Sequence, residues 1–423
     1  MNKLRGVRII DMSRVLAGPL AGQMLADLGA EVIKIEQPGK GDEARQYGPP
    51  FHGDEADGGS AFFLAANRNK RSVAVDFSTP EGSRIIQELA AKSDVVIENF
   101  RMGTLARYGL DYATLSARNP GLVYCSLTGF GQSGPYAARP GYDAIFQAMG
   151  GLMSSIGHPD DHPAGGPMRT GLSITDVITS LYADVAIIAA LHARAGNGGK
   201  GDHIDIALLD STVAAMSHYA MHYLISGRMI PRRGNAGNGG VPSQVFRCSD
   251  GAIMLTVGND GQFARFCEAL GHPEWAADGR FSSGVARIKN RDVLIPILEA
   301  HFARRTAAEC LEALVAADIP AGPINSIEEA FADPQVVARG LRTPARQDGR
   351  DAHDVIANPI RYANDPAGDY DRAPLLGEHT DTVLGELLGC SPAELERLAR
   401  SGVIGRHRSS PPIHSNRSTK DLQ

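Results

Sequence analysis

The sequence predicts an α/β protein built on a parallel sheet, and two observations support this class. Strand-like and helix-like segments alternate through the first half of the chain. Glycine-bounded turns follow several of the predicted strands, at the position where ligands bind in open α/β sheets. The predicted strands span residues 7–12, 31–36, 72–77, 94–100 and 122–130, and residues 203–210 form a predicted edge strand.

The helices between these strands carry recognisable end signals. The first contains Gly18-Pro19 and ends at Gly29. Thr79-Pro80-Glu81 opens another helix, because it offers a capping hydroxyl, a proline at the first helical position and an early acid. A long apolar helix is predicted from Asp176 until a glycine closes it.

The length of 423 residues favours two domains. Around residues 225–245 the composition shifts toward glycine and basic residues, which is typical of a linker or an active-site loop. We predict a large domain over residues 1–225, a small α/β domain over 226–330 and a return segment over 331–405 that completes the large domain. The polar tail, residues 406–423, is predicted to be disordered.

Composition and charge exclude several classes of partner. A formal net charge of -6 and a pI near 6.1 give no general attraction for nucleic acid or anionic membranes. No apolar run reaches the roughly 18 residues of a membrane helix, and the N-terminus does not resemble a signal peptide. Five widely spaced cysteines form no CxxC pair, which predicts neither a disulfide framework nor a zinc site. A cytoplasmic protein is therefore expected.

Six basic residues lie beside the turns that follow the predicted strands, where they suit the phosphate groups of a ligand. The alternative is that they solvate the surface. No GxGxxG motif occurs at the first turn, which argues against a nicotinamide or flavin oxidoreductase. The six residues are Arg14, Lys34, Lys70, Arg71, Arg101 and Arg107.

Asp176 ends the segment RTGLSITD at the start of the long apolar helix, where the helix dipole stabilises a charged carboxylate. By itself this position favours a helix cap or first-turn acid over a nucleophile. His218 and His222 have a metal-like spacing but lack a third ligand, so core or interface histidines are favoured. Residues 158–162, HPDDH, suit a surface loop at least equally well. No metal site is predicted.

Five long motifs occur in order along the chain: RIIDMSRVLAGPLAGQMLADLGAEVIKIEQPGKGDEAR, NRNKRSVAVDFSTPEG, VVIENFRMGTLARYGLDY, GLVYCSLTGFGQSGPYAARPGYDAIFQAMGG and GLSITDVITSLYADVAIIAALHARAGNGGKGDHIDIALLDS. In this order they resemble the class III CoA-transferases, the family of formyl-CoA transferase and carnitine CoA-transferase. The resemblance covers nearly the whole chain to about residue 405. It implies a Rossmann-like large domain, a smaller domain, a ring-shaped subunit and an interlocked homodimer.

The resemblance also implies roles for individual residues. Asp176 would attack the thioester of the donor acyl-CoA and then carry CoA as an aspartyl thioester. Residues 234–240 lie where this family has a glycine-rich loop that closes over the intermediate. The chain departs from formyl-CoA transferase at Leu16, where that enzyme has glutamine, and at Gln37, where it has a phosphate-binding arginine. Acyl-CoA would be bound as a substrate, with no tightly held cofactor, by Arg14, Val15, Ala17, Lys70, Asn99, Phe100, Arg101 and Arg107.

Within this family the sequence looks most like the branch that transfers CoA from succinyl-CoA to glutarate and other short dicarboxylates. The second carboxylate of the acceptor would need a cation, for which Arg169, Arg232 and Arg233 are candidates. Oxalate or a carnitine-like acid stays open as the acceptor. An α-methylacyl-CoA racemase is disfavoured, because its catalytic histidine is replaced in Gly141-Tyr142-Asp143. A non-catalytic CoA-binding protein is the remaining alternative.

Overall fold

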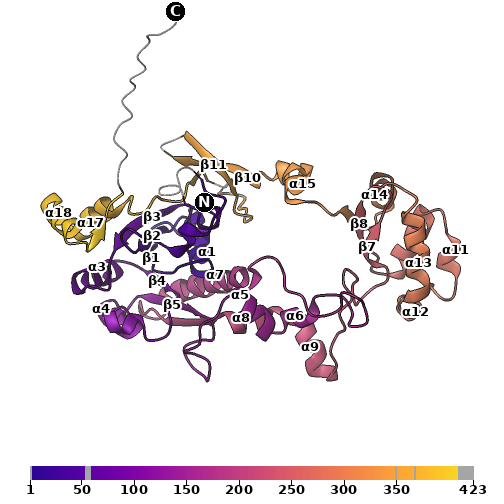
Figure 1. The fold of residues 1–423 in the computed structure, drawn as a ribbon, viewed down its shortest axis with the longest axis horizontal. Coiled ribbons are helices and arrows are strands. Elements are labelled where there is room, and N and C mark those ends of the chain that lie inside the picture. The colour runs from indigo at the N-terminus through magenta and orange to yellow at the C-terminus, as the bar shows by residue number, and fades with distance from the viewer. Residues whose placement is uncertain (1, 53–58, 348–349, 366–367, 408–423) are drawn as a thin grey trace, which may run out of the picture. The chain divides into compact units, whose positions relative to one another are not determined.

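The computed structural model describes residues 2–52, 59–347, 350–365 and 368–407 (Figure 1). The chain forms two compact units: unit 1 contains residues 1–146, 172–215 and 341–423, and unit 2 contains residues 147–171 and 216–340. Unit 1 therefore draws on both ends of the chain, and the units change at residues other than the predicted 225 and 330. Of the predicted disordered tail, residues 408–423 lie outside the described residues.

Unit 1 is built on a seven-stranded sheet in the order β13-β3-β2-β1-β4-β5-β6. All neighbouring strands run parallel except β13, which is antiparallel to β3. The prediction of a parallel sheet with residues 203–210 at its edge is thus confirmed in its main part. The strands are β1 (Arg8–Asp11), β2 (Glu31–Glu36), β3 (Lys70–Val75), β4 (Val95–Glu98), β5 (Val123–Thr128), β6 (His203–Ala207) and β13 (Ile404–Gly405).

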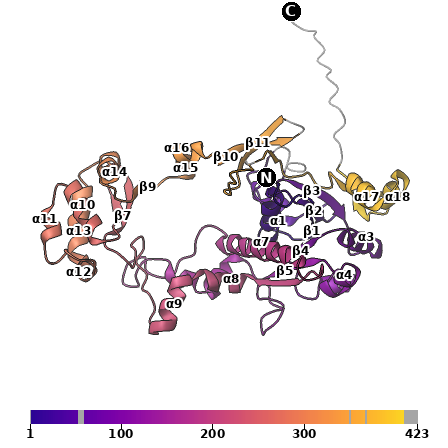
Figure 2. The ribbon, with the colours of Figure 1, turned by 180° about the vertical axis from the view of Figure 1, so that it is seen from behind.

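Helices cover both faces of this sheet. On one face α1 (Ala17–Asp27) and α7 (Ile174–Arg194) pack against apolar side chains of the central strands. On the other face lie α3 (Pro80–Ala91), α4 (Tyr112–Arg118), α17 (Thr380–Leu388) and α18 (Pro392–Arg400). Both views show α17 and α18, coloured yellow, beside α3 although some 300 residues separate them in sequence (Figure 2). The sheet is therefore doubly wound, with a core on each side.

Local signals explain where these helices begin. The Thr79 side chain accepts a hydrogen bond from the backbone N–H of Gly82 at 3.0 Å, with Pro80 at the first helical position, as the sequence predicts. The remaining elements of unit 1 are η1 (Glu43–Gln46), α2 (Ala61–Leu64), η2 (Leu105–Tyr108), α8 (Leu208–Ala215) and a three-stranded sheet of β11 (Arg350–Ile356), β10 (Arg342–Gln347) and β12 (Tyr370–Asp371); α5 (Asp143–Met149) begins in unit 1.

Unit 2 has its own core, in which phenylalanines pack between a small sheet and several helices. The sheet contains β7 (Ser243–Arg247), β8 (Ala252–Thr256) and β9 (Ala321–Pro323), all antiparallel to their neighbours. The helices are α6 (Leu152–Ser155), α9 (Ser217–Ser226), α10 (Asp260–Ala269), α11 (Glu274–Ala277), α12 (Gly284–Lys289), α13 (Arg291–Phe302), α14 (Ala307–Ala316), α15 (Ile327–Ala332) and α16 (Pro334–Ala338).

One described helix, α7, is long and apolar enough to cross a membrane when only length and composition are considered, so the expectation that no segment reaches that length is wrong for α7. Core helices of water-soluble proteins meet the same criterion. In unit 1, α7 packs against α1, β5 and β6, and it carries the acidic residues Asp176 and Asp184. These features are those of a helix that packs in a protein core on one side.

Candidate active site

The sheet order places a ligand crevice between β1 and β4. The chain leaves β1 toward β2 and leaves β4 toward β5, so the connections diverge at this point and open a crevice at the carboxyl ends of the strands. Asn99 fastens the two turns together: its Oδ1 accepts from the Arg14 N–H at 2.9 Å, and its Nδ2 donates to the Arg14 carbonyl at 2.7 Å. The turn after β1 and the turn after β4 therefore form one wall.

The turn after β1 has an unusual backbone at Val15. Its φ is +70°, a left-handed conformation that β-branched residues rarely adopt. The Val15 N–H donates to Asp42 Oδ1 at 3.1 Å, and the other oxygen of Asp42 forms a buried ion pair with Lys34 at 2.9 Å. This fixed, strained turn starts α1 at Ala17, next to the crevice.

Asp176 lies in the first turn of α7 and meets the first turn of α1. Its carboxylate accepts a hydrogen bond from the backbone N–H of Ala17. The helix is capped from outside, because Ser173 makes no side-chain cap whereas Asp143 Oδ1 accepts from the Thr175 N–H at 2.8 Å and from Thr175 Oγ1 at 2.5 Å. Asp176 is therefore a first-turn acid whose side chain is left available for chemistry.

The surroundings of Asp176 make its carboxylate unusually basic. Burial and, to a smaller extent, the nearby negative charge of Asp143 raise its pKa to about 7, and the Ala17 N–H only partly opposes these effects. A carboxylate with such a pKa is ionised in part at neutral pH and is a better nucleophile than an ordinary aspartate. Perturbed carboxyl groups of this kind are typical of active sites.

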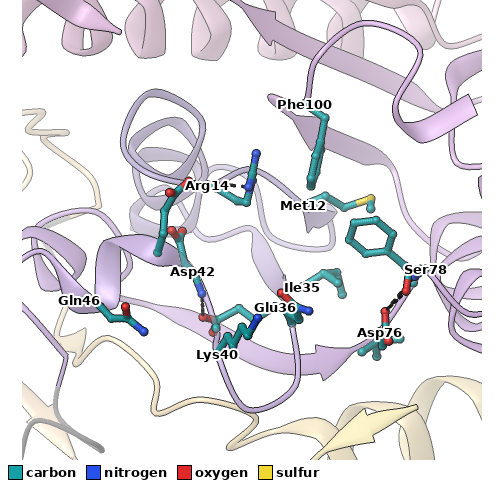
Figure 3. A pocket seen from close by; sticks show the side chains of 15 residues that line it. Met12, Arg14, Ile35, Glu36, Lys40, Asp42, Gln46, Asp76, Ser78 and Phe100 are labelled. Carbon is teal, nitrogen blue, oxygen red and sulfur yellow. Dashed lines mark hydrogen bonds and ion pairs between the residues drawn. The ribbon is translucent and has the colours of Figure 1, made fainter. Parts of the chain in front are cut away.

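A cavity of about 350 Å³ opens at the carboxyl ends of β1, β2 and β3 (Figure 3). Its apolar part can hold a flat ring, and it is formed by Met12, Ile35, Val75, Phe77 and Phe100. Two cations, Arg14 and Lys40, also line it, together with the acidic residues Glu36, Asp42, Glu43 and Asp76. The Arg14 guanidinium lies 4.6 Å from the centre of the Phe100 ring and 3.7 Å from Glu43, whereas Lys40 makes no ion pair within the described residues. The cavity therefore suits a ligand with a flat ring, and Lys40 is the cation available to an anionic group on it.

A second, smaller cavity of about 80 Å³ is also lined by Phe100. It is polar, with Glu98, Ser126 and His203 in its wall, and Arg101 also lines it. The turn that follows β4 thus contributes to two neighbouring cavities.

Four of the six basic residues singled out in the sequence form ion pairs within unit 1, and one of them is Arg14, which lies 3.7 Å from Glu43. Lys70 is buried, and its Nζ donates to Asp11 Oδ2 at 2.8 Å, to the Pro19 carbonyl at 2.7 Å and to Asn67 Oδ1 at 2.9 Å. Lys34 is buried with Asp42, and Arg71 pairs with Glu31 and Glu386. Neither of the buried lysines solvates the surface, and the three donors of Lys70 are already used.

The other predicted binding residues lie near the crevice. Arg14 and Phe100 line the larger cavity, Asn99 joins its two turns, and Arg101 lines the smaller one. Arg107 lies on η2 with its guanidinium 6.0 Å from the Tyr108 ring, outside the described lining of both cavities. Gln37 lines the larger cavity, and Leu16 is the N-cap residue of α1.

No group of three or more metal-ligating side chains occurs among the described residues. His158 and His162 stack on each other at 4.2 Å. His218 and His222 are exposed on α9, so the expectation of core histidines is wrong for this chain, and the interface alternative stays a prediction. All five cysteines lie in the described part of the chain and are free.

Three residues of the site were missed in the sequence. Lys40 stands in an open loop that gave no ligand signal, and Glu98 is the last residue of an apolar strand. Asp143 is part of the triplet Gly141-Tyr142-Asp143, whose lack of a histidine argued against a racemase but indicated no role for the aspartate. An acid at the start of a helix could have been recognised as a first-turn acid of that helix, but not as the cap of α7, whose Thr175 is 32 residues further along the chain.

The fold and the site together define an α/β enzyme class with a nucleotide-sized crevice at the switch point of its sheet and a basic carboxylate beside it. Comparison with known proteins agrees. The family model for CoA-transferase family III matches residues 4–380, and the chain belongs to this family of enzymes.

Individual relatives cover nearly the whole chain. A succinate–glutarate CoA-transferase of Agrobacterium fabrum is 47% identical over 388 residues, which are 91% of this chain and 95% of the relative. A human succinyl-CoA:glutarate CoA-transferase is 41% identical, covering 96% of this chain and 90% of the relative. The crystal structure of a CAIB/BAIF family protein from Brucella suis superimposes with a TM-score of 0.82 at 43% identity, covering 92% of this chain and all of that one.

Proposed function

We propose that this enzyme transfers CoA from succinyl-CoA to a short dicarboxylic acid, with Asp176 as the covalent carrier. The observation that carries the proposal is the position of Asp176, a carboxylate of raised pKa at the mouth of the switch-point crevice. The names of several relatives support the substrates. They include succinyl-CoA as donor with glutarate, D-citramalate, L-malate or mesaconate as acceptor.

The reaction consists of four acyl exchanges. The Asp176 carboxylate attacks the thioester carbonyl of succinyl-CoA and expels the CoA thiolate, which leaves a mixed anhydride. The thiolate then attacks the aspartyl carbonyl, releases succinate and forms an aspartyl-CoA thioester. The acceptor carboxylate attacks this thioester, and the thiolate finally attacks the acceptor carbonyl of the second anhydride and frees Asp176. Every step passes on an activated acyl bond, so no thioester energy is lost to water.

The protein supplies the nucleophile, its orientation and its surroundings. The Ala17 N–H already donates to the Asp176 carboxylate and can stabilise negative charge that develops on it. Leu16 has no polar side chain that could stabilise this negative charge. Backbone N–H donors therefore stabilise more of it here than in formyl-CoA transferase, which has glutamine at this position. Burial around Asp176 reduces the access of water to the anhydride and thioester intermediates.

We place the nucleotide part of acyl-CoA in the larger cavity of unit 1. The adenine ring would rest on the apolar side chains, with Phe100 and Arg14 on one side of the cavity (Figure 3). Lys40 offers the phosphate groups a cation close to Gln37, where formyl-CoA transferase has its arginine. The backbone of Val15 and Ala17 then lies between this cavity and Asp176.

The substrate proposal is tested by following the formation of new acyl-CoA from succinyl-CoA with a panel of acceptors. We expect glutarate and other short dicarboxylates to be accepted, and monocarboxylates of equal chain length to be poor acceptors. Preferred use of oxalate or of a carnitine-like acid would contradict the dicarboxylate proposal. Exchange of the α-proton of a branched acyl-CoA without CoA transfer would instead support a racemase.

Replacing Asp143 with asparagine is expected to shift the pH dependence of CoA transfer. Asp176 must be ionised to attack, so kcat of the native enzyme, measured with saturating acyl-CoA, should rise with pH through about 7. Asparagine can still accept from Thr175 but carries no charge, so the pKa of Asp176 falls and the rise should move to lower pH. An unchanged or upward-shifted rise in the Asp143→Asn variant would show that Asp143 does not act on the nucleophile.

We also propose that the protein is a homodimer, as the family resemblance implies. The face of α7 that points away from the sheet exposes Leu181, Tyr182, Val185 and Ile188, with 46%, 46%, 67% and 38% of their surfaces accessible. An apolar stripe of this size on a helix is typical of a surface that another protein covers. Light scattering during size-exclusion chromatography should give twice the chain mass. The Val185→Asp variant should shift the mass toward one chain, and a native monomer would contradict the proposal.

A further inference from the structure

Glu98 ends β4 and holds the turn that follows it. Its side chain is only 5% exposed, and Oε2 accepts a hydrogen bond from the Phe100 N–H at 2.8 Å. That turn contains Asn99, Phe100 and Arg101, which the family resemblance assigns to acyl-CoA binding, and the proposed function places Phe100 beside the adenine ring. Glu98 therefore contacts the backbone of the proposed binding turn from inside the protein.

The carboxyl group of Glu98 continues into a short hydrogen-bonded chain across the sheet. Ser126 on β5 hydrogen-bonds to Glu98, and Ser126 Oγ lies 3.1 Å from Nε2 of His203 on β6. The His203 ring stacks on Tyr112 at 4.9 Å. Because a hydroxyl can donate or accept, Ser126 can serve Glu98 in either protonation state by reversing its direction toward His203.

Within the described residues, no cation forms an ion pair with Glu98. Burial and, to a smaller extent, the charge of Asp205 on β6 raise its pKa to about 7, against the opposing hydrogen bonds from Ser126 and Phe100. Burial also lowers the pKa of His203, which is thus neutral near pH 7. Other titratable or charged groups line the same small cavity as Glu98: Asp111 and Tyr112 at α4, Tyr124 on β5 and Arg101 in the turn. Burial and, in addition, the charge of Glu98 raise the pKa of Tyr124 and of Cys125 on β5.

We propose that Glu98 is a positioning residue for acyl-CoA, which binds more tightly when Glu98 carries a proton. The proposal rests on the proposed function, because it takes the turn after β4 as part of the CoA site. Both protonation states keep an oxygen for the Phe100 N–H, so the turn stays in place. The ionised state, however, adds a buried negative charge without an ion-pair partner next to a ligand that carries phosphate groups.

The sign of the effect follows from linkage. A bound polyanion disfavours the ionised form of Glu98 and raises its pKa, so binding takes up a proton. Affinity for CoA should therefore fall as pH rises through about 7, by about tenfold for each unit by which bound CoA raises the pKa of Glu98.

The test measures the dissociation constant of CoA by calorimetry from about pH 6 to about pH 9 in the full-length Asp176→Asn protein, where the nucleophile neither reacts nor titrates. The matched protein carries Glu98→Gln in addition, which keeps an acceptor for the Phe100 N–H but no charge. We expect the first protein to lose affinity with rising pH and the second to lose much less. Titration of the CoA phosphate is common to both proteins and cancels in the comparison.

Parallel pH profiles in the two proteins would overturn the proposal, whereas failure of both to bind CoA at any pH would instead overturn the proposed function. Glu98→Leu in the same background separates positioning from charge, because leucine leaves the Phe100 N–H without its acceptor. We expect this variant to bind CoA more weakly than Glu98→Gln at every pH. Equal affinities would show that the hydrogen bond does not position the turn.

Discussion

Replacing Asp176 with alanine or asparagine should reduce CoA transfer at least about a thousandfold, because the covalent route has no other carboxylate in its place. The nearby Asp143 is a poor substitute, because its Oδ1 already accepts two hydrogen bonds from Thr175 at the start of α7. The fold should remain, since replacing Asp176 removes a buried carboxylate whose ionisation is unfavourable. Activity is measured as the rate of glutaryl-CoA formation.

A matched control comes from the same helix. Asp184 lies two turns beyond Asp176 and is buried, and neither of its carboxylate oxygens has a hydrogen-bond partner in the part of the chain that the structure describes. Burial raises its pKa to about 8, so it resembles Asp176 in charge behaviour but not in access to the crevice. The Asp184→Asn variant should keep transfer within a few fold. Substantial activity in the Asp176 variants, or equal losses at both positions, would contradict the nucleophile assignment.

Replacing Lys70 with alanine should destabilise the protein by about 3–5 kcal/mol, because it leaves Asp11 as a buried carboxylate without its partner. Both side chains are fully inaccessible, and Asp11 also accepts from the Ser13 N–H at 3.0 Å. The loss should therefore extend to the turn after β1. Urea denaturation monitored by circular dichroism measures the change in unfolding free energy.

Lys40 provides the comparison for Lys70. It lies at the cavity and, within the described residues, forms no ion pair, so the Lys40→Ala variant should keep its stability and bind CoA less tightly. The family resemblance alone assigns phosphate binding to Lys70, and we propose Lys40 for that role because it lines the cavity and the donors of Lys70 are in use. Normal stability together with weaker CoA binding in the Lys70→Ala variant would reverse this assignment.

The fold was largely predictable from local sequence signals. Apolar runs located the strands of the main sheet, and Thr79-Pro80-Glu81 located the start of α3 because cap chemistry depends on neighbouring residues alone. Only the family resemblance predicted that segments from both ends of the chain form unit 1 together. Its physical basis is the pairing of β13 with β3 and the packing of α17 and α18 on the sheet, contacts that span some 300 residues.

The site was predictable only in part. Asp176 was ambiguous by itself, because a cap and a nucleophile occupy the same place at the start of a helix. Lys70 and Asp11 are 59 residues apart, so no local sequence pattern predicts their ion pair. The raised pKa values of Asp176 and Glu98 likewise come from burial and from charges on other elements. Such properties depend on tertiary packing and become visible only when the chain is folded.

The central claim is that Asp176 carries CoA covalently, and the intact mass of the protein after incubation with succinyl-CoA tests it most directly. The native protein should gain the mass of CoA less one water, because the aspartyl thioester forms as succinate leaves. Adding glutarate should remove the adduct and yield glutaryl-CoA. The Asp176→Ala variant should gain nothing. An adduct of equal size on that variant, or none on the native protein, would contradict the account.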